Sequence, residues 1–102
     1  MLTLPVRFRE GALSDLENIW QYFICEGASR ATVKAFVGRL RDKCELIGRL
    51  PYGYPAAGAE YPNLRTAPFE HSAMIFYAVT DVCVEIVNIY YRGRDYRAVL
   101  ED

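Results

Sequence analysis

The side chains in this sequence that could do chemistry are mainly arginines. Arg92 and Arg94 follow an apolar segment that ends in Tyr91, and Arg65 follows a proline-rich stretch. A guanidinium group binds carboxylates and phosphates through paired hydrogen bonds, so these positions could hold an acidic protein partner or a nucleic-acid phosphate. Cleaving RNA without a metal would also need one group that activates the 2′-hydroxyl and another that protonates the leaving oxygen.

Acid–base groups are scarce in this chain. His71 is the only histidine, and it stands just before an expected strand. A lone histidine in that position is more often a surface or turn residue than a catalyst. Tyr96 is the other candidate, but an unperturbed phenol with a pKa of about 10 is a poor base.

Composition predicts a single domain, residues 1–102, in the cytoplasm. The chain has 102 residues, 52% of them apolar, which is enough for one compact core. It has no run of about 18 apolar residues and carries charge by Arg7, so neither a membrane span nor a secretory signal is expected. The formal net charge is -1, without the basic excess typical of proteins that bind nucleic-acid phosphates.

Two amphipathic helices are predicted in the first half of the chain. Apolar residues recur every three or four positions from about 11 to 26, and again from Ser29, the expected cap, to a stop before Pro51. The first helix is acidic and the second is basic. We expect the basic residues on one flank of the second helix to pair with carboxylates of the first: Arg30, Lys34 and Arg41.

Four strands are expected, over residues 2–8, 64–69, 73–79 and 82–91. Pro5 restricts the first to a sheet edge, a bulge or a position whose N–H needs no partner, and Pro68 interrupts the second. The last two form a hairpin with a tight turn at Thr80-Asp81, and the last strand is apolar on both faces, which predicts a central position. Residues 95–102 read as a short terminal helix capped by Asp95.

A loop connects the helical half to these strands. Residues 51–63 contain three prolines and two glycines, which disfavour a regular element. We expect the tyrosines of this loop to cover the core: Tyr52, Tyr54 and Tyr61.

The three cysteines are expected to be reduced and mostly buried. Cys25 falls at the turn between the helices and Cys44 lies about four turns along the second helix, roughly 20 Å away, so no disulfide can join them. We expect both to be small core residues. Cys83 forms no C-x-x-C pair with either, and with one histidine in the chain no zinc site or other cofactor is expected.

Several short patterns together resemble a known family. They are F-x-x-x-A-x-x-D-L-x-x-I-W-x-Y from Phe8 to Tyr22, L-P-x-G from Leu50 to Gly53, P-x-L-R from Pro62 to Arg65, I-F-Y from Ile75 to Tyr77, and R-D at Arg94-Asp95. Over nearly the whole chain they resemble the ParE branch of the RelE/ParE toxin superfamily. The resemblance implies an α+β fold in the order β-α-α-β-β-β, with an antiparallel sheet packed against a two-helix hairpin and a short C-terminal helix.

The same resemblance implies a toxin of a type II toxin–antitoxin system. ParE-like members poison DNA gyrase, which arrests growth and serves plasmid stabilisation. They are neutralised by a cognate antitoxin, often a ribbon-helix-helix protein encoded beside them, whose C-terminal segment wraps the toxin. DNA would then be contacted only through the antitoxin complex. RelE-like members share the fold but cleave mRNA on the ribosome.

The residues favour a protein-binding toxin over a ribonuclease. Arg65 and Arg92 stand close to where RelE-like toxins place basic residues, which leaves His71 as the acid–base candidate, but residues 98–100 contain no Tyr or His. An inactive, antitoxin-binding relative stays open as a third possibility. For contact with gyrase or the antitoxin we predict Arg92, Arg94, Tyr91, Arg65, Trp20 and Phe23. The candidates for an exposed apolar groove are Trp20, Phe23 and the edge of the sheet, with core packing as the stronger interpretation for the two aromatics.

Overall fold

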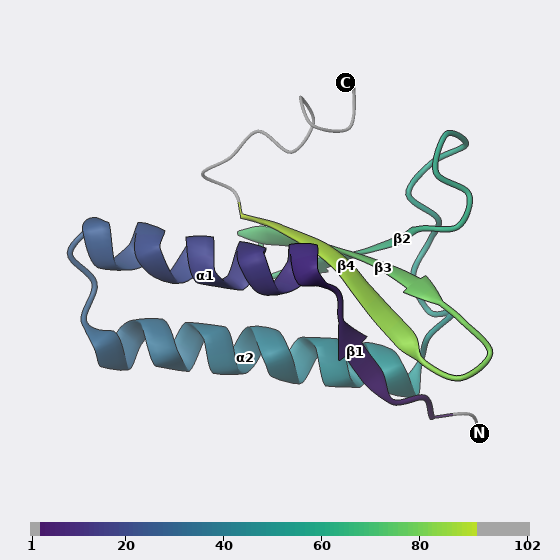
Figure 1. The fold of residues 1–102 in the computed structure, drawn as a ribbon, viewed down its shortest axis with the longest axis horizontal. Coiled ribbons are helices and arrows are strands. Elements are labelled where there is room, and N and C mark those ends of the chain that lie inside the picture. Colours follow the sequence, from purple (N-terminus) through teal and green to yellow (C-terminus); the bar gives the residue numbers. More distant parts are fainter. Residues whose placement is uncertain (1–2, 92–102) are drawn as a thin grey trace.

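The computed structural model describes residues 3–91, and its element order is the predicted one. Figure 1 shows two antiparallel helices side by side, packed against a twisted sheet. The elements are β1 (Val6–Phe8), α1 (Glu10–Cys25), α2 (Arg30–Arg49), β2 (Arg65–Phe69), β3 (Ala73–Val79) and β4 (Val84–Tyr91). The α+β class and the β-α-α-β-β-β order are therefore confirmed. The expected helix over residues 95–102 lies outside the described residues.

The sheet is mixed, whereas the sequence suggested an antiparallel one. Its strand order is β1-β4-β3-β2, and β1 runs parallel to β4 while the other neighbours are antiparallel. The reason lies in the helix hairpin, which carries the chain out along α1 and back along α2. The chain therefore re-enters the sheet at β2 in the direction of β1, and β2 is itself parallel to β4 through β3. The central position of β4 is confirmed.

The helix ends follow from local sequence. The Ser29 side chain accepts a hydrogen bond from the Thr32 amide, 3.1 Å away, and so caps α2 as predicted. Gly27 follows α1 with a φ of +92°, a left-handed conformation that glycine adopts without steric cost. The core lies between the helices and one face of the sheet, and its largest fully buried members include Tyr77, Leu40 and Ile47.

The first strand is shorter than predicted, and beyond its end a side chain of α1 accepts a backbone hydrogen bond from β4. The expected strand covered residues 2–8, but β1 spans Val6–Phe8, and before it the Leu4 amide donates to the Gly48 carbonyl of α2. Beyond the end of β1, the Ile89 amide of β4 donates instead to the Asp15 carboxylate of α1, at 2.8 Å. Asp15 thus satisfies a backbone donor that would otherwise need a neighbouring strand.

Two side-chain expectations are corrected by the structure. Cys44 and Cys83 are buried and all three cysteines are free, but Cys25 is exposed because it lies in the last turn of α1, past the core. Tyr54 packs against the core, whereas Tyr52 is 63% exposed and lies under a guanidinium instead. Within residues 3–91, no helix combines the length and apolar character needed to cross a membrane.

Candidate functional site

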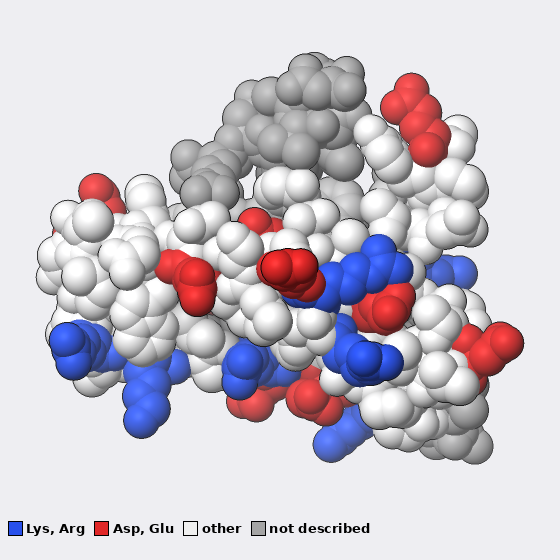
Figure 2. Space-filling model, viewed as in Figure 1, with Lys and Arg blue, Asp and Glu red and all other residues white. Residues whose placement is uncertain are grey.

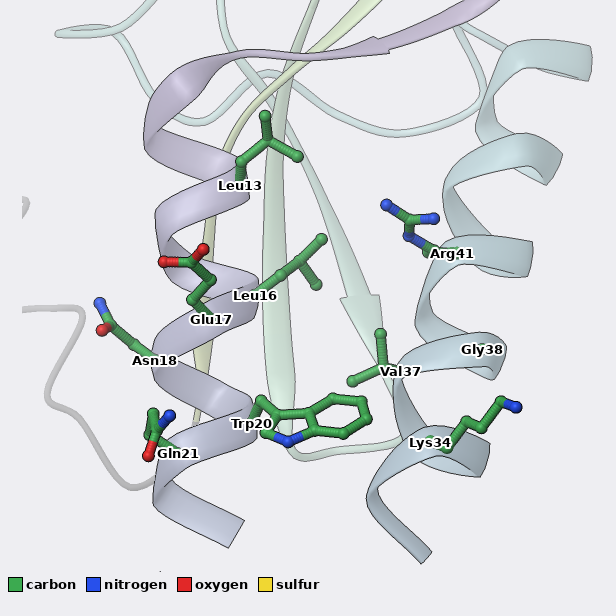
Figure 3. Close-up of a pocket in the computed structure, with 10 residues that line it drawn as sticks. All are labelled: Leu13, Leu16, Glu17, Asn18, Trp20, Gln21, Lys34, Val37, Gly38 and Arg41. Atoms are coloured by element: carbon green, nitrogen blue, oxygen red, sulfur yellow. The ribbon is translucent and has the colours of Figure 1, made fainter. Parts of the chain in front are cut away.

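A groove of about 880 Å³ lies between α1 and α2. Figure 3 shows side chains from both helices turned toward it, with the Trp20 indole reaching from α1 toward Val37 of α2. Its lining residues are Leu13, Leu16, Glu17, Asn18, Trp20 and Gln21 from α1, and Lys34, Val37, Gly38 and Arg41 from α2. The volume is in the range of protein sites that enclose a small ligand or a few partner side chains.

The middle of the groove is apolar and open. Leu16 is buried, Trp20 is half-buried, and Leu13 keeps 46% of its surface exposed. At Gly38 the helix surface is bare, because a Cβ built there would meet no atom within 4 Å. A contiguous apolar surface left open in this way is a characteristic of protein interaction sites.

Basic side chains on α2 form the rim of the groove. Figure 2 shows a row of Lys and Arg side chains over α2, below acidic side chains of α1. Lys34 and Arg41 are both exposed, and the Arg41 guanidinium lies 5.6 Å from the centre of the Phe8 ring. The ion pairs of the described residues are Arg9–Glu85 and Arg39–Glu70.

The predicted pairing of the basic flank with the first helix is therefore wrong for Arg30, Lys34 and Arg41. Lys34 and Arg41 line the groove from α2 and Glu17 lines it from α1, but the ion pairs within residues 3–91 include none between the two helices. These cations remain available to an acidic partner.

The two aromatics predicted for a groove have different roles. Trp20 lines the groove, as proposed for an interaction surface. Phe23 turns toward the core, with its ring centre 5.0 Å from that of Phe36 and 5.2 Å from that of Tyr91. For Phe23, core packing is the correct interpretation, and Tyr91 belongs to the same aromatic cluster.

Arg65 holds a loop in place. Its Nη1 donates to the Tyr54 carbonyl, and its guanidinium lies 5.0 Å from the centre of the Tyr52 ring. The Lys43 ammonium donates to the Tyr54 hydroxyl from the other side. Both cations thus fix the loop that follows α2, which makes Arg65 a structural residue in this state of the protein.

Tyr77 also holds the loop that follows α2, from the core side. It is fully buried, and its hydroxyl donates to the Pro51 carbonyl at 2.9 Å. Burial raises the pKa of the Tyr77 phenol, so it stays protonated and keeps donating at neutral pH. Sequence reasoning missed both Lys43 and Tyr77, because their partners lie in a loop whose path no periodic pattern predicts.

His71 lies at the opposite end of β2 from Arg65. It is exposed in the turn between β2 and β3, where Glu70 and His71 have φ angles of 48° and 56°. The expectation of a surface or turn residue is confirmed. Because β2 is five residues long, Arg65 and His71 are separated by about 13 Å or more along the strand. They cannot act on one phosphate group in this arrangement.

Two predicted contact residues, Arg92 and Arg94, lie outside the described residues. Within residues 3–91, no three His, Cys, Asp or Glu side chains are grouped closely enough to hold a metal ion.

Comparison with known protein families identifies the family of this chain. The family described as ParE toxin of type II toxin-antitoxin system, parDE, matches residues 6–96. The chain belongs to this ParE toxin family. The resemblance seen in the short sequence patterns is thus confirmed, and with it the assignment to the toxin side of a toxin–antitoxin system. Comparison with curated protein sequences gives no match for this ParE-family chain.

Solved structures of toxin–antitoxin systems share the fold of this ParE-family toxin. A chain of the chromosomal ParDE TA system of P. aeruginosa is 14% identical with a TM-score of 0.75, over 87% of this chain and 96% of that one. A chain of the RelBE2 toxin–antitoxin complex of Mycobacterium tuberculosis is 18% identical with a TM-score of 0.64, over 92% and 97%. A chain of the E. coli DinJ–YafQ toxin–antitoxin complex is 10% identical with a TM-score of 0.51, over 90% and 96%.

Proposed function

We propose that this ParE-family chain is a non-enzymatic toxin that inhibits DNA gyrase by binding it and is neutralised by a cognate antitoxin. The observation that carries the proposal is the family match across residues 6–96. The fold does not choose the target, because ParDE, RelBE2 and DinJ–YafQ chains all share it. The choice between gyrase and mRNA therefore depends on the residues.

The arrangement of the candidate ribonuclease residues supports a binding role. Arg65 is engaged by the carbonyl of Tyr54 and the ring of Tyr52, and His71 lies at the far end of the same strand. A metal-independent ribonuclease needs a cation and an acid–base group on one phosphate. The formal net charge of -1 also gives little general attraction to ribosomal RNA.

The groove supports an antitoxin partner. An amphipathic helix could lay apolar side chains over Trp20 and the bare surface at Gly38, and place acidic side chains against Lys34 and Arg41. The charge complementarity would speed association and fix the orientation of the helix. We therefore expect the cognate antitoxin to present an acidic amphipathic segment to this groove.

Controlled expression in bacteria tests the target directly. Growth, gyrase supercoiling and mRNA integrity are measured in parallel after induction. Growth arrest with trapped, cleaved DNA and intact message is the expected result. Fragmented message with unaffected supercoiling would refute gyrase inhibition in favour of the ribonuclease alternative, and normal growth would indicate an inactive antitoxin-binding protein.

Arginine variants in the same assay test the contact residues. Arg92→Ala and Arg94→Ala should each weaken growth arrest, because the arginines that follow β4 are predicted to bind carboxylates of the target. Arg97→Ala is the matched control, because we expect that side chain to be solvated. Full toxicity of both test variants, with normal protein levels, would exclude the predicted arginine contact.

A further inference from the structure

The groove between α1 and α2 carries opposite charges on its two sides. Glu17 lines it from α1, and Lys34 and Arg41 line it from α2. All three side chains are exposed, and none of them belongs to an ion pair within residues 3–91. A surface that presents both signs of charge can be complementary to a copy of itself, which is what a two-fold interface requires.

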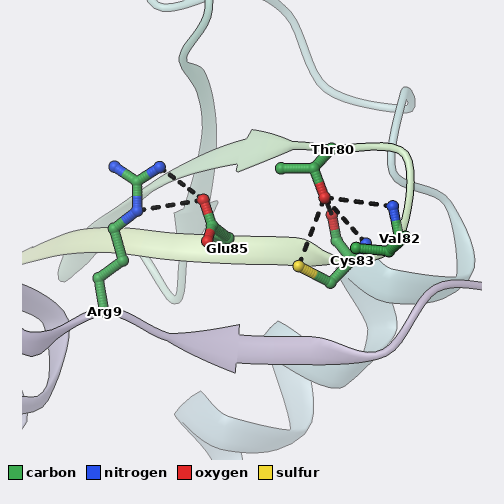
Figure 4. A network of polar contacts seen from close by, with 5 residues as sticks. All are labelled: Arg9, Thr80, Val82, Cys83 and Glu85. Atoms are coloured by element: carbon green, nitrogen blue, oxygen red, sulfur yellow. Dashed lines mark hydrogen bonds and ion pairs between the residues drawn. The ribbon is translucent and has the colours of Figure 1, made fainter.

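Other cations of the described chain are already engaged. Figure 4 shows Arg9 turned toward Glu85 of β4, with which it forms an ion pair. Arg39, on another face of α2, is paired with Glu70 at 2.8 Å. A second chain could bind these arginines only in competition with their present partners. The cations that line the groove have no such ion pair to lose.

The helix hairpin places Glu17 level with Gly38. Glu17 lies eight residues before the end of α1, and Gly38 lies eight residues after the start of α2. Because the helices are antiparallel and joined by a short turn, the two residues lie at about the same level. Lys34 and Arg41 are about one helical turn, or about 5 Å, to either side of Gly38. Figure 3 accordingly shows Glu17 at a height between Arg41 and Lys34.

A two-fold axis along the groove would bring these charges together. A second copy turned by 180° about this axis lays its α1 over α2 of the first copy, antiparallel to it. Glu17 of each copy then lies over Gly38 of the other, where the helix surface is bare. Lys34 and Arg41 flank that position. An axis across the groove would instead set α1 on α1 and α2 on α2, so that like charges oppose each other.

The apolar side chains of the groove lie along the same axis. Leu13 keeps 46% of its surface exposed, and Trp20 is half-buried. Figure 3 shows the Trp20 indole reaching from α1 across the groove. In the two-fold arrangement the Trp20 rings of the two copies meet near the axis and cover each other. A central tryptophan surrounded by charged groups is typical of protein interfaces whose affinity rests on a few residues.

We infer that the free toxin forms a two-fold dimer through the groove between α1 and α2, with Glu17 of each copy between Lys34 and Arg41 of the other. The dimer concerns the toxin alone and does not depend on gyrase or on mRNA. An antitoxin segment that enters the groove would have to displace the second copy. Only that last consequence rests on the proposed function.

Sedimentation and light scattering of the full chain measure the dimer directly. From micromolar to millimolar protein, the wild type should pass from monomer to dimer. Salt at about 1 M should raise the dissociation constant severalfold, because it screens exposed charges. In NMR spectra of the ¹⁵N-labelled chain, the Trp20 and Gly38 amides should shift with protein concentration, while the Thr66 amide on β2 should not.

Charge reversal tests the arrangement of the two copies. Glu17→Lys and Lys34→Glu should each raise the dissociation constant about tenfold or more, because attraction becomes repulsion twice in each homodimer. An equimolar mixture of the two variants should form a heterodimer about as tight as the wild type. There the new lysine meets the new glutamate on one side, and the native pair remains on the other. Glu60→Lys, an exposed loop position outside the groove, is the matched control and should not change the dissociation constant.

Four results would overturn the inference. The wild type could stay monomeric at millimolar concentration, or the dimer could be equally tight in the two test variants and in Glu60→Lys. The mixture could form no heterodimer although circular dichroism shows both variants folded, or the concentration-dependent shifts could fall at Thr66 rather than in the groove. None of these results bears on gyrase inhibition, which the toxicity assay measures separately.

Discussion

Two glycines of α2 should respond in opposite directions to the same substitution. Gly38 lies in the helix interior, and an added Cβ meets no atom within 4 Å. Gly38→Ala should therefore stabilise the protein by about 0.8–1 kcal/mol, the difference in helix propensity between the two residues. At Gly48 an added Cβ would lie 2.5 Å from the Leu4 carbonyl oxygen and 2.8 Å from Val6 Cγ2.

Gly48→Ala should be destabilising because one of those clashing atoms belongs to the backbone of another segment. The chain before β1 would have to move, which strains the 2.8 Å hydrogen bond from the Leu4 amide to the Gly48 carbonyl. Overpacking costs about 1–3 kcal/mol, a weakened hydrogen bond about 1 kcal/mol, and the propensity gain offsets about 1 kcal/mol. We expect a net loss of about 1–3 kcal/mol.

Urea unfolding measures both changes on one scale, with fluorescence of Trp20, the only tryptophan, and circular dichroism as probes. With an m value of about 1–2 kcal/mol/M, the midpoints of the two variants should differ by about 1–4 M. Equal stability of Gly48→Ala and the wild type would show that α2 does not fix the approach to β1. A loss of stability in Gly38→Ala would show that the groove surface at this position is filled.

Three further predictions concern single contacts. Asp15→Ala should cost about 1–3 kcal/mol in unfolding free energy, because it leaves a β4 amide unsatisfied, and Asp15→Asn should cost less since it keeps an acceptor. The hydrogen bond from Arg39 lowers the pKa of Glu70, so this pair stabilises the fold above the pKa that the carboxyl has in the unfolded chain. The stability advantage of the wild type over Glu70→Gln should therefore vanish as the pH falls through the lowered pKa. A difference in stability that stays constant with pH would contradict this prediction. Native labelling with iodoacetamide, followed by mass spectrometry, should modify Cys25 first, because burial raises the pKa of Cys44 to about 12; rapid labelling of Cys44 would refute its burial.

Local patterns predicted the elements well where one signal dominated. The period of apolar residues, the Ser29 cap and the stop before Pro51 lie within single helices, and these predictions are confirmed. The pairing of β1 depends on how far the helix hairpin carries the chain, which no window of the sequence contains. The length of β1 was overestimated because residues 2–8 have strand-like alternation, whereas the structure has a strand over Val6–Phe8. Cys25 was misplaced because an apolar residue in a last helical turn can lie past the core.

The candidate site was harder to predict because it is a groove, and sequence patterns do not show which space between two helices stays unfilled. Trp20 was a candidate from its position on the apolar face of the first helix, but the open space beside it depends on how the two helices pack and on Gly38, which adds no side chain to the lining. The unpaired state of Lys34 and Arg41 was also hidden, since helical spacing suggests partners without fixing the distance between two helices. Composition gave a net charge of -1, which conceals a basic rim on one side of this groove.

The use of cations in this protein connects its stability with its proposed binding role. Arg65 and Lys43 hold the loop that follows α2, and that loop in turn closes the outer edge of β2 through the Pro55 carbonyl. Cations that fix a loop in this way have fewer N–H donors left for a phosphate. Arg41 lines the groove between α1 and α2 and has no ion pair within residues 3–91. An acidic partner would therefore meet engaged cations at β2 and unpaired ones beside the groove.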